Sequence, residues 1–425
     1  MAATARDGRD DSGRVIPGAL SRRELLAGTA GAISLLALSR AAPSAAAFTA
    51  PAVRLPPPPR RADEDALDAA FARLQEGDWH NRGGLSSHAP MAVEALAALG
   101  AGAAISGWIE QFARNARPVE LPQPRERIDV EQWRRHVGLV QPESSSWDRA
   151  NARYGDWLVH FTEQLRERPW RELLATWAPR FAPGFCAAAM HGVIRTAHAA
   201  RALQRRESPP RLAELARGLA YWASSFQELG TGSGDGGRES AAVPATLAAA
   251  LAAVPLHREQ KGDAPRGNLV EGLRAAGSLP GCPDAVTIAE LAGDPSRAIM
   301  AMTATMARAY LRHGTRRHAI AFVHAVTGPA ALRKLSAVLP PEAASTLVPY
   351  AWQAAIGLYS AYAATDRETG ELAIAAEGTP ATLAANAAEA TDAHVIKFTE
   401  ALLAEHAVHA DPAYLAAAED IPQRF

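Results

Sequence analysis

Cysteine is scarce in this chain of 425 residues, which contains only Cys186 and Cys282. Two thiols exclude a disulfide framework, since at most one bridge can form. They also exclude a zinc site built from three or four thiolates. We interpret both cysteines as small buried hydrophobic residues.

An excess of charge of either sign is also missing. The chain has 44 basic and 45 acidic residues and a formal net charge of -1. This balance argues against nucleic acid or an anionic membrane surface as the main partner, because each would call for a basic excess. The sequence contains no GxSxG nucleophile elbow. The glycine-rich segment 230–237 follows a predicted helix and precedes no lysine, so we expect a surface loop there and not a phosphate-binding loop.

An apolar run long enough to span a bilayer is absent from the N-terminal region. The run from Leu25 to Leu38 has 14 residues, and a spanning helix needs roughly 20. Arg22 and Arg23 precede this run, and small residues up to Ala47 follow it. The pattern predicts a twin-arginine-type signal peptide over 1–47, cleaved after Ala47. We therefore expect the twin-arginine export machinery as a partner, a periplasmic or secreted location, and no stable membrane anchor.

What the sequence contains in abundance is helix-forming residues. After a proline-rich linker over 48–61, alanine and leucine dominate, and apolar residues recur at spacings of three and four. We predict one all-α domain over 62–425. Gly100 and Gly314 are expected to end helices with positive φ, and Thr391 or Asp392 to cap the helix that follows. The clearest helices are predicted over 66–75, 91–100, 155–167, 211–229, 300–314, 347–365 and 393–407.

Four histidines lie in apolar helical segments: His88, His191, His324 and His394. Neutral imidazole is a good ligand for iron, copper, zinc or nickel, and helix bundles hold such ions between their helices. A lone histidine on an apolar helix face is more often an ordinary core residue, so the prediction of one buried metal site rests on the four together. The histidines in polar or helix-end contexts are set aside: His80, His136, His160, His257, His313, His318, His406 and His409.

Two further side chains belong to the same segments. His198 lies seven residues after His191 on the same helix face, so it is either a further ligand or a neighbour one layer away. Lys397 lies three residues after His394, and burial of its ammonium is expected to lower its pKa. A neutral lysine beside a metal can react with carbon dioxide to form a carbamate, which is an anionic oxygen ligand. The ordinary alternative is that Lys397 reaches solvent with its amine.

Five stretches carry a resemblance to the questin oxidase-like family across about residues 66–418. They are SSHAPMAVEALAALGA, PGFCAAAMHGVIRTAHAARAL, HAVTGPAALRKL, DAHVIKFTEALL and DPAYLAAA. The resemblance implies oxidative opening of aromatic polyketide rings, by a Baeyer–Villiger-type reaction with NADPH in some members and by non-haem iron in others. The ligands that it implies are His88, His191, His324 and His394, with Lys397 as a carboxylated lysine.

The chain departs from the family pattern at several positions. Ser87 and Met91 replace an asparagine and a second histidine that relatives show, so His88 alone can serve in the first motif. Arg195 and His198 also differ, which suggests another substrate pocket.

From these observations we expect an oxygenase that uses Fe(II) and O2 on a small aromatic substrate. Lys397, Arg195 and His198 are the expected catalytic residues, and Arg195, Tyr359 and Tyr362 the expected pocket residues. The predicted export disfavours NADPH, which is confined to the cytoplasm. Two alternatives remain open at this point: a hydrolase that uses the same histidines with zinc, and a non-catalytic helical binding protein whose histidines are structural.

Overall fold

A computed structural model describes most of the chain after its N-terminal region. The described residues are 60–81, 87–138, 152–229, 246–280, 282, 291, 293–365, 372 and 374–425. The predicted signal peptide, nearly all of the predicted linker and the glycine-rich segment 230–237 lie outside these residues.

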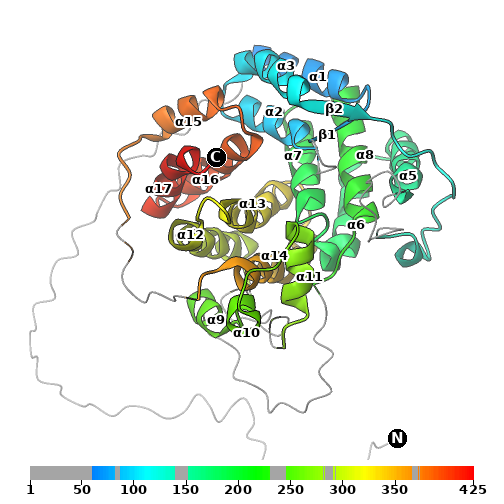
Figure 1. The fold of residues 1–425 in the computed structure, drawn as a ribbon. Coiled ribbons are helices and arrows are strands. Elements are labelled where there is room, and N and C mark those ends of the chain that lie inside the picture. Colours follow the sequence, from blue (N-terminus) through cyan, green and yellow to red (C-terminus); the bar gives the residue numbers. More distant parts are fainter. Residues whose placement is uncertain are drawn as a thin grey trace, which may run out of the picture. The chain divides into compact units, whose positions relative to one another are not determined.

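The described residues are overwhelmingly helical, as predicted (Figure 1). The helices from Ala52 onward belong to one compact unit that runs to Phe425. None of the helices described is both long enough and apolar enough to cross a membrane. The first eight helices that the structure describes are α1 (Arg61–Leu74), α2 (Ala89–Ala98), α3 (Ile105–Asn115), α5 (Arg153–Glu167), α6 (Trp170–Phe181), α7 (His191–Arg205), α8 (Pro209–Ser224) and α9 (Leu247–Ala253). They are followed by α10 (His257–Lys261), α11 (Leu269–Gly277), α12 (Pro295–His313), α13 (Ala319–Ser336), α14 (Pro341–Tyr362), α15 (Pro380–Glu389), α16 (Ala393–Val408) and α17 (Pro412–Asp420).

A short antiparallel ribbon is the departure from the all-α prediction. Strands β1 (Asp78–Asn81) and β2 (Ala116–Val119) pair with each other, with Asp78 opposite Val119 and Asn81 opposite Ala116. With four residues in each strand, the ribbon joins the ends of the α1 and α3 regions and leaves the fold class as predicted.

Four helices that are distant in sequence form a closed ring. Helix α2 packs on α7, α7 on α13, α13 on α16, and α16 on α2. Their sequences provide apolar residues on nearly every face, which is typical of helices buried on all sides. Of the 16 residues of α16, for example, 13 are buried. The ring is therefore an interior structure, and side chains that point to its centre are shielded by the surrounding helices.

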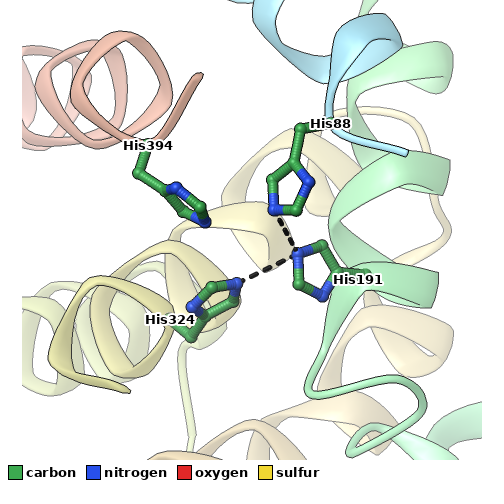
Figure 2. A group of neighbouring side chains, drawn as sticks. All are labelled: His88, His191, His324 and His394. Atoms are coloured by element: carbon green, nitrogen blue, oxygen red, sulfur yellow. Dashed lines mark hydrogen bonds between the residues drawn. The ribbon is translucent and has the colours of Figure 1, made fainter. Parts of the chain in front are cut away.

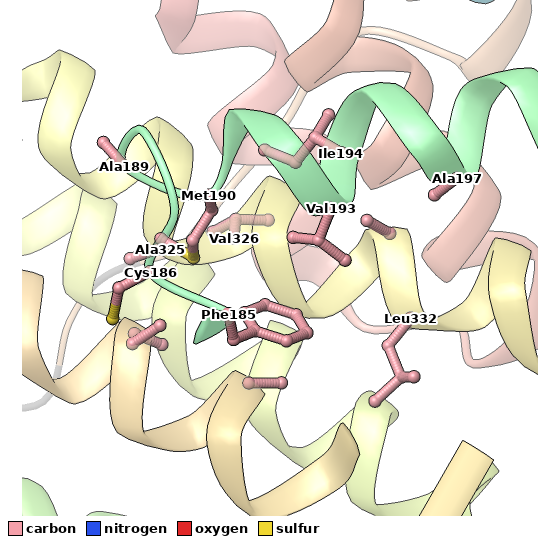
Figure 3. Packing of buried hydrophobic residues seen from close by; sticks show 14 of the residues in the cluster. Phe185, Cys186, Ala189, Met190, Val193, Ile194, Ala197, Ala325, Val326 and Leu332 are labelled. Carbon is pink, nitrogen blue, oxygen red and sulfur yellow. The ribbon is translucent and has the colours of Figure 1, made fainter. Parts of the chain in front are cut away.

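Glycines allow two of these helices to approach their neighbours closely. A Cβ on Gly192 of α7 would lie 2.6 Å from the Cα of Trp222 on α8, and a Cβ on Gly218 of α8 would lie 2.9 Å from the Cα of Thr196. On α13, a Cβ on Gly328 would collide with the sulfur of Met190, which precedes α7. Figure 3 shows Met190 and Val193 directed towards Ala325 and Val326 in this apolar region.

The ends of the helices and the state of the cysteines can be compared with the predictions. Gly100 has φ 73° after α2, as predicted. Gly314 ends α12, as predicted, but the expectation of a positive φ is wrong for it, because it has φ -72° and ψ 57°. The helix predicted over 211–229 ends already at Ser224, and the residues that follow contact α11, where Gln227 donates to the carbonyl oxygen of Val270. Both cysteines are buried free thiols, as predicted, and burial raises the pKa of Cys186 to about 12, with a smaller contribution from Cys282.

Candidate metal centre

Each helix of the ring contributes one histidine to a single cluster (Figure 2). His88 directly precedes α2, His191 is the first residue of α7, His324 lies within α13, and His394 is the second residue of α16. All four are buried, and one potential ligand nitrogen from each lies within 4.8 Å of the other three. The predicted convergence of these four residues between helices is confirmed.

The nitrogen atoms approach one another at coordination-like distances. The Nε2 atom of His191 lies 3.0 Å from Nε2 of His88 and 3.1 Å from Nε2 of His324. The Nε2 atom of His394 is buried without a hydrogen-bond partner among the described residues. Two nitrogens bound at 2.0–2.1 Å to one ion are at most about 4.2 Å apart. The observed spread therefore fits one ion after shifts of a few tenths of an ångström.

Hydrogen bonds on the far side of the rings fix the tautomers. The Nδ1 atom of His191 donates to the carbonyl oxygen of Ala188 at 2.6 Å, and that of His324 donates to the carbonyl of Ile320 at 2.7 Å. The Nδ1 atom of His394 donates to Oδ1 of Asp392 at 2.9 Å. Because an oxygen acceptor holds the proton on Nδ1, each of these three Nε2 atoms presents a lone pair to the centre. His191 and His324 then have no proton to share, and a cation between their lone pairs satisfies both.

Burial keeps the four imidazoles neutral. It lowers the pKa of His88, His191 and His324 well below the usual 6.5, and the nearby charge of Lys397 adds to the effect. The pKa of His394 is also lowered, although Asp392 opposes the shift. A neutral imidazole is the form that binds a metal, so the donor set is ready to coordinate at neutral pH. The residues present therefore fit a resident metal ion.

A strained backbone segment holds His191 in place. Ala188, Ala189 and Met190 have φ values of 48°, 55° and 70°, and none of them is glycine. The left-handed region costs such residues roughly 1–2 kcal/mol each. The segment turns the chain directly into α7 and aims the carbonyl of Ala188 at the His191 ring. Strain of this kind is retained where the surrounding structure requires one conformation, and it is enriched at functional sites.

Three helix N-termini also converge on the cluster. His88 directly precedes α2, His191 is the first residue of α7, and His394 is the second residue of α16. A helix N-terminus carries a partial positive charge. The three together disfavour protonated histidine and favour an anionic group beside the cluster.

Lys397 lies one turn beyond His394 and is 2% exposed. Burial lowers its pKa to about 7, as predicted, and Asp392 opposes the shift only weakly. No hydrogen-bond or salt-bridge partner of its amine is found among the described residues. Its charge acts on all four histidines, so the buried amine lies within electrostatic reach of the whole cluster.

His198 belongs to a second, ionic layer below the histidines. Its Nδ1 donates to Oε2 of Glu94 at 2.5 Å, and Arg201 bonds both Glu94 and Glu400. Lys334 pairs with Glu400 at 3.2 Å. Burial lowers the pKa of His198 to about 4 against the pull of Glu94. Of the two roles predicted for His198, the structure places it as a neighbour one layer away, and it is not part of the four-histidine group.

Arg195 is engaged elsewhere. Its Nε donates to Oε1 of Glu214 on α8 at 2.6 Å, and its Nη2 donates to Oε2 at 3.1 Å. Both side chains are almost completely buried. This bidentate pair joins α7 to α8, and Arg195 does not line the cavity described next.

A cavity of about 820 Å³ opens on the histidine cluster, and all four histidines line it. Tyr362 lines it as predicted, whereas Tyr359 packs against His313 and Phe322 in the core. His318, which its polar context had set aside, also lines the cavity. The remaining lining residues are Gly138, Ala188, Ala189, Tyr221, Ser225, Phe226, Gln227, Pro265, Arg266, Gly267, Asn268, Leu269, Val270, Arg274, Arg317, Ile320 and Ala321.

Several of these residues carry no signal in the sequence. Arg266, Arg274 and Arg317 occur in polar segments that resemble ordinary solvent-exposed surface. Their spacing in the sequence shows no regular period. Only the packing of α11 and of the segment before α13 beside the cluster brings them to one opening.

The chain was also compared with known proteins. No protein-family model matches it, and no curated protein is significantly similar to it.

Proposed function

We propose that the protein is a metal-dependent oxygenase that oxidises an aromatic, quinone-like substrate with O2. The observation that supports this proposal best is the four-histidine cluster at the floor of a cavity large enough for a tricyclic substrate. The resemblance to the questin oxidase-like family, carried by the motifs around His88, His191, His324 and His394, points to the same chemistry. A bound Fe(II) ion supplies electron transfer to O2, which neutral histidine ligands permit.

The protein's residues would bind the ion, orient its ligand atoms and shield it from water. His191, His324 and His394 direct unprotonated Nε2 atoms to one point, held there by Ala188, Ile320 and Asp392. The surrounding ring of helices excludes water from the side opposite the cavity. The electrons come from an electron-rich substrate such as a phenolate or hydroquinone, so the reaction as proposed requires no NADPH.

Lys397 has a specific place in this proposal. With a pKa near 7 about half of its amine is unprotonated at neutral pH, and the unprotonated amine is the form that attacks carbon dioxide. The amine and carbon dioxide give a carbamate and one proton, and the carbamate adds a negative charge beside the ion. Three helix N-termini at the cluster stabilise such an anion.

The decisive measurement is metal content by mass spectrometry of protein produced with iron and bicarbonate. We expect about one equivalent of iron, lost in His191→Ala and in His324→Ala. His409→Ala is the matched control, because His409 is exposed and follows the end of α16 opposite to His394. An O2-uptake screen with hydroxyanthraquinones follows, with Lys397→Met and bicarbonate omission as tests of the carbamate.

The same experiment separates the alternatives. One equivalent of zinc and turnover that is independent of O2 would assign the site to hydrolysis. The absence of any metal would leave the histidines with a structural role in a binding protein.

A further inference from the structure

Three arginines at the opening of the cavity have no acidic partner in the part of the chain that the structure describes. Arg266, Arg274 and Arg317 all line the cavity and are exposed. They come from three separate segments: the loop before α11, α11 itself and the segment that precedes α13. None of them forms a salt bridge with a described residue, although the chain as a whole has slightly more acidic than basic residues.

The described residues that line the cavity include no aspartate or glutamate. Glu271 lies close in sequence, but its Oε2 accepts from the backbone nitrogen of Asn268 at 3.0 Å and completes the cap of α11. His318 is a buried basic residue that also lines the cavity, and it stays uncharged. Burial lowers its pKa, and the charges of Arg258 and Arg317 lower it further. Among the described residues, three arginines and the one nearby carboxylate of Glu271 therefore leave the opening with a net positive charge.

Apart from the three arginines, the described walls of the cavity are neutral and partly aromatic. Tyr221, Phe226 and Tyr362 line them. Burial, together with the nearby Glu271, raises the pKa of Tyr362 to about 12, so its hydroxyl stays protonated and donates to the carbonyl of Asn268 at 3.3 Å. Aromatic walls suit a flat ring system, and guanidinium groups match the planar, two-oxygen geometry of a carboxylate.

We propose that the substrate of this site is an aromatic acid whose carboxylate is held by Arg266, Arg274 and Arg317 while its ring system lies between Phe226 and Tyr362 over the histidine cluster. The inference rests on the proposed function only for the reaction at the rings. The arginines act on the anionic end of the molecule, away from the ion. They select the substrate and set the direction in which it enters.

Binding of a fluorescent pair of probes tests this selectivity. Anthracene-2-carboxylate and anthracene-2-carboxamide have the same rings and differ in charge. We expect the acid to bind at least about 10-fold more tightly than the amide, with each of Arg266→Gln, Arg274→Gln and Arg317→Gln weakening the acid by about 3- to 10-fold. The triple variant should bind both probes equally. Arg73→Gln, at an exposed arginine of α1 with no described partner, is the matched control and should change neither affinity.

Equal binding of acid and amide by the unmodified protein would overturn the proposal, as would unchanged acid binding in the three single variants. Displacement of the acid by an equal concentration of inorganic phosphate would also overturn it, since the arginines would then form a site for small anions.

A further measurement tests this inference separately from the proposed function. The titrations are repeated on chelator-treated protein, where the ratio between acid and amide should persist. A ratio that disappears with the metal assigns the selectivity to the ion and contradicts the role of the arginines. A protein that binds no metal even when it is produced with iron, and that still keeps the ratio, would contradict the proposed function alone.

Discussion

One oxygen of Asp392 holds both the backbone and the ring of His394. Its Oδ1 accepts the backbone N–H of His394 at 2.7 Å, which caps α16, and the ring Nδ1–H at 2.9 Å. The start of the helix and the direction of the imidazole are therefore set by the same atom. A carboxylate behind a metal-binding histidine fixes its tautomer and makes its other nitrogen more basic.

Asp392→Asn should separate these two roles, because the amide oxygen can still cap the helix but lacks the charge. We expect metal affinity to fall by about 10- to 100-fold and the free energy of unfolding by less than about 1 kcal/mol. Competition with a chelator of known affinity measures the first quantity, and chemical denaturation the second. Asp294→Asn, which changes the cap of α12, should leave metal affinity unaltered. Unchanged affinity in Asp392→Asn would show that the carboxylate does not support the ligand.

Gly328→Ala should disturb the site through Met190. The new methyl group would collide with the methionine sulfur, and Met190 directly precedes His191. We expect a loss of about 1–3 kcal/mol in the free energy of unfolding together with weaker metal binding. Gly107→Ala provides the contrast, because a Cβ there meets nothing within 4 Å and should stabilise α3 by up to about 1 kcal/mol. Stabilisation by both substitutions would refute the close contact between α13 and Met190.

Ala189→Gly should relieve strain in the left-handed turn. Glycine adopts φ 55° without the steric cost that alanine incurs. We expect the net gain in stability to be about 0.5–1 kcal/mol, since glycine also gains freedom in the unfolded chain. The matched substitution Ala197→Gly lies within α7 and should cost about 1 kcal/mol. Thermal denaturation of the two variants distinguishes the signs, and destabilisation of similar size by both would argue against the turn.

Glu400→Gln tests the ionic layer through its pH dependence. Although burial alone would raise it, the charges of Arg201 and Lys334 hold the pKa of Glu400 at about 2, below its usual 4.5. Between these values the unfolded chain binds more protons, so this contribution to stability is full above about pH 5 and falls as the pH drops towards 2. We expect the variant to be less stable by roughly 3 kcal/mol at pH 7, with a difference that shrinks in acid.

Urea denaturation between pH 7 and pH 3 measures this difference. The exposed residue Glu163 on α5 supplies the control, and Glu163→Gln should show no comparable change. A difference that stays constant with pH would mean that Glu400 is not held in its charged form.

The four histidines could be predicted from sequence because their surroundings are local. An imidazole within an alanine- and leucine-rich helix is conspicuous wherever it occurs, and the same holds for Lys397 three residues after His394. A cap at Thr391 or Asp392 follows from the identity of the residues before a helix, and the structure selects Asp392. These features depend on a few neighbouring residues, and so they can be read before any tertiary contact is known.

Other features of the site depend on how deeply a side chain is buried and on which residues from distant segments contact it. A helical wheel places His198 and Arg195 relative to His191, but it does not tell which neighbour each will meet, and both pair with buried glutamates. The left-handed turn at Ala188–Met190 contradicts local preference, since alanine and methionine favour ordinary helix. The arginines of the cavity opening were missed for the opposite reason, because nothing in their own segments distinguishes them.

The positions of the histidines along the chain have a consequence of their own. His88 and His191 are separated by 103 residues, and His191 and His324 by 133. An ion held by all of them closes very large loops, and such a tether removes more freedom from the unfolded chain than a short one does. In a protein with only two cysteines, both of them free, this coordination would do the work of a set of cross-links. Removal of the ion by a chelator would then lower the stability of the whole domain. The melting temperature would rise with the fraction of the protein that holds the ion.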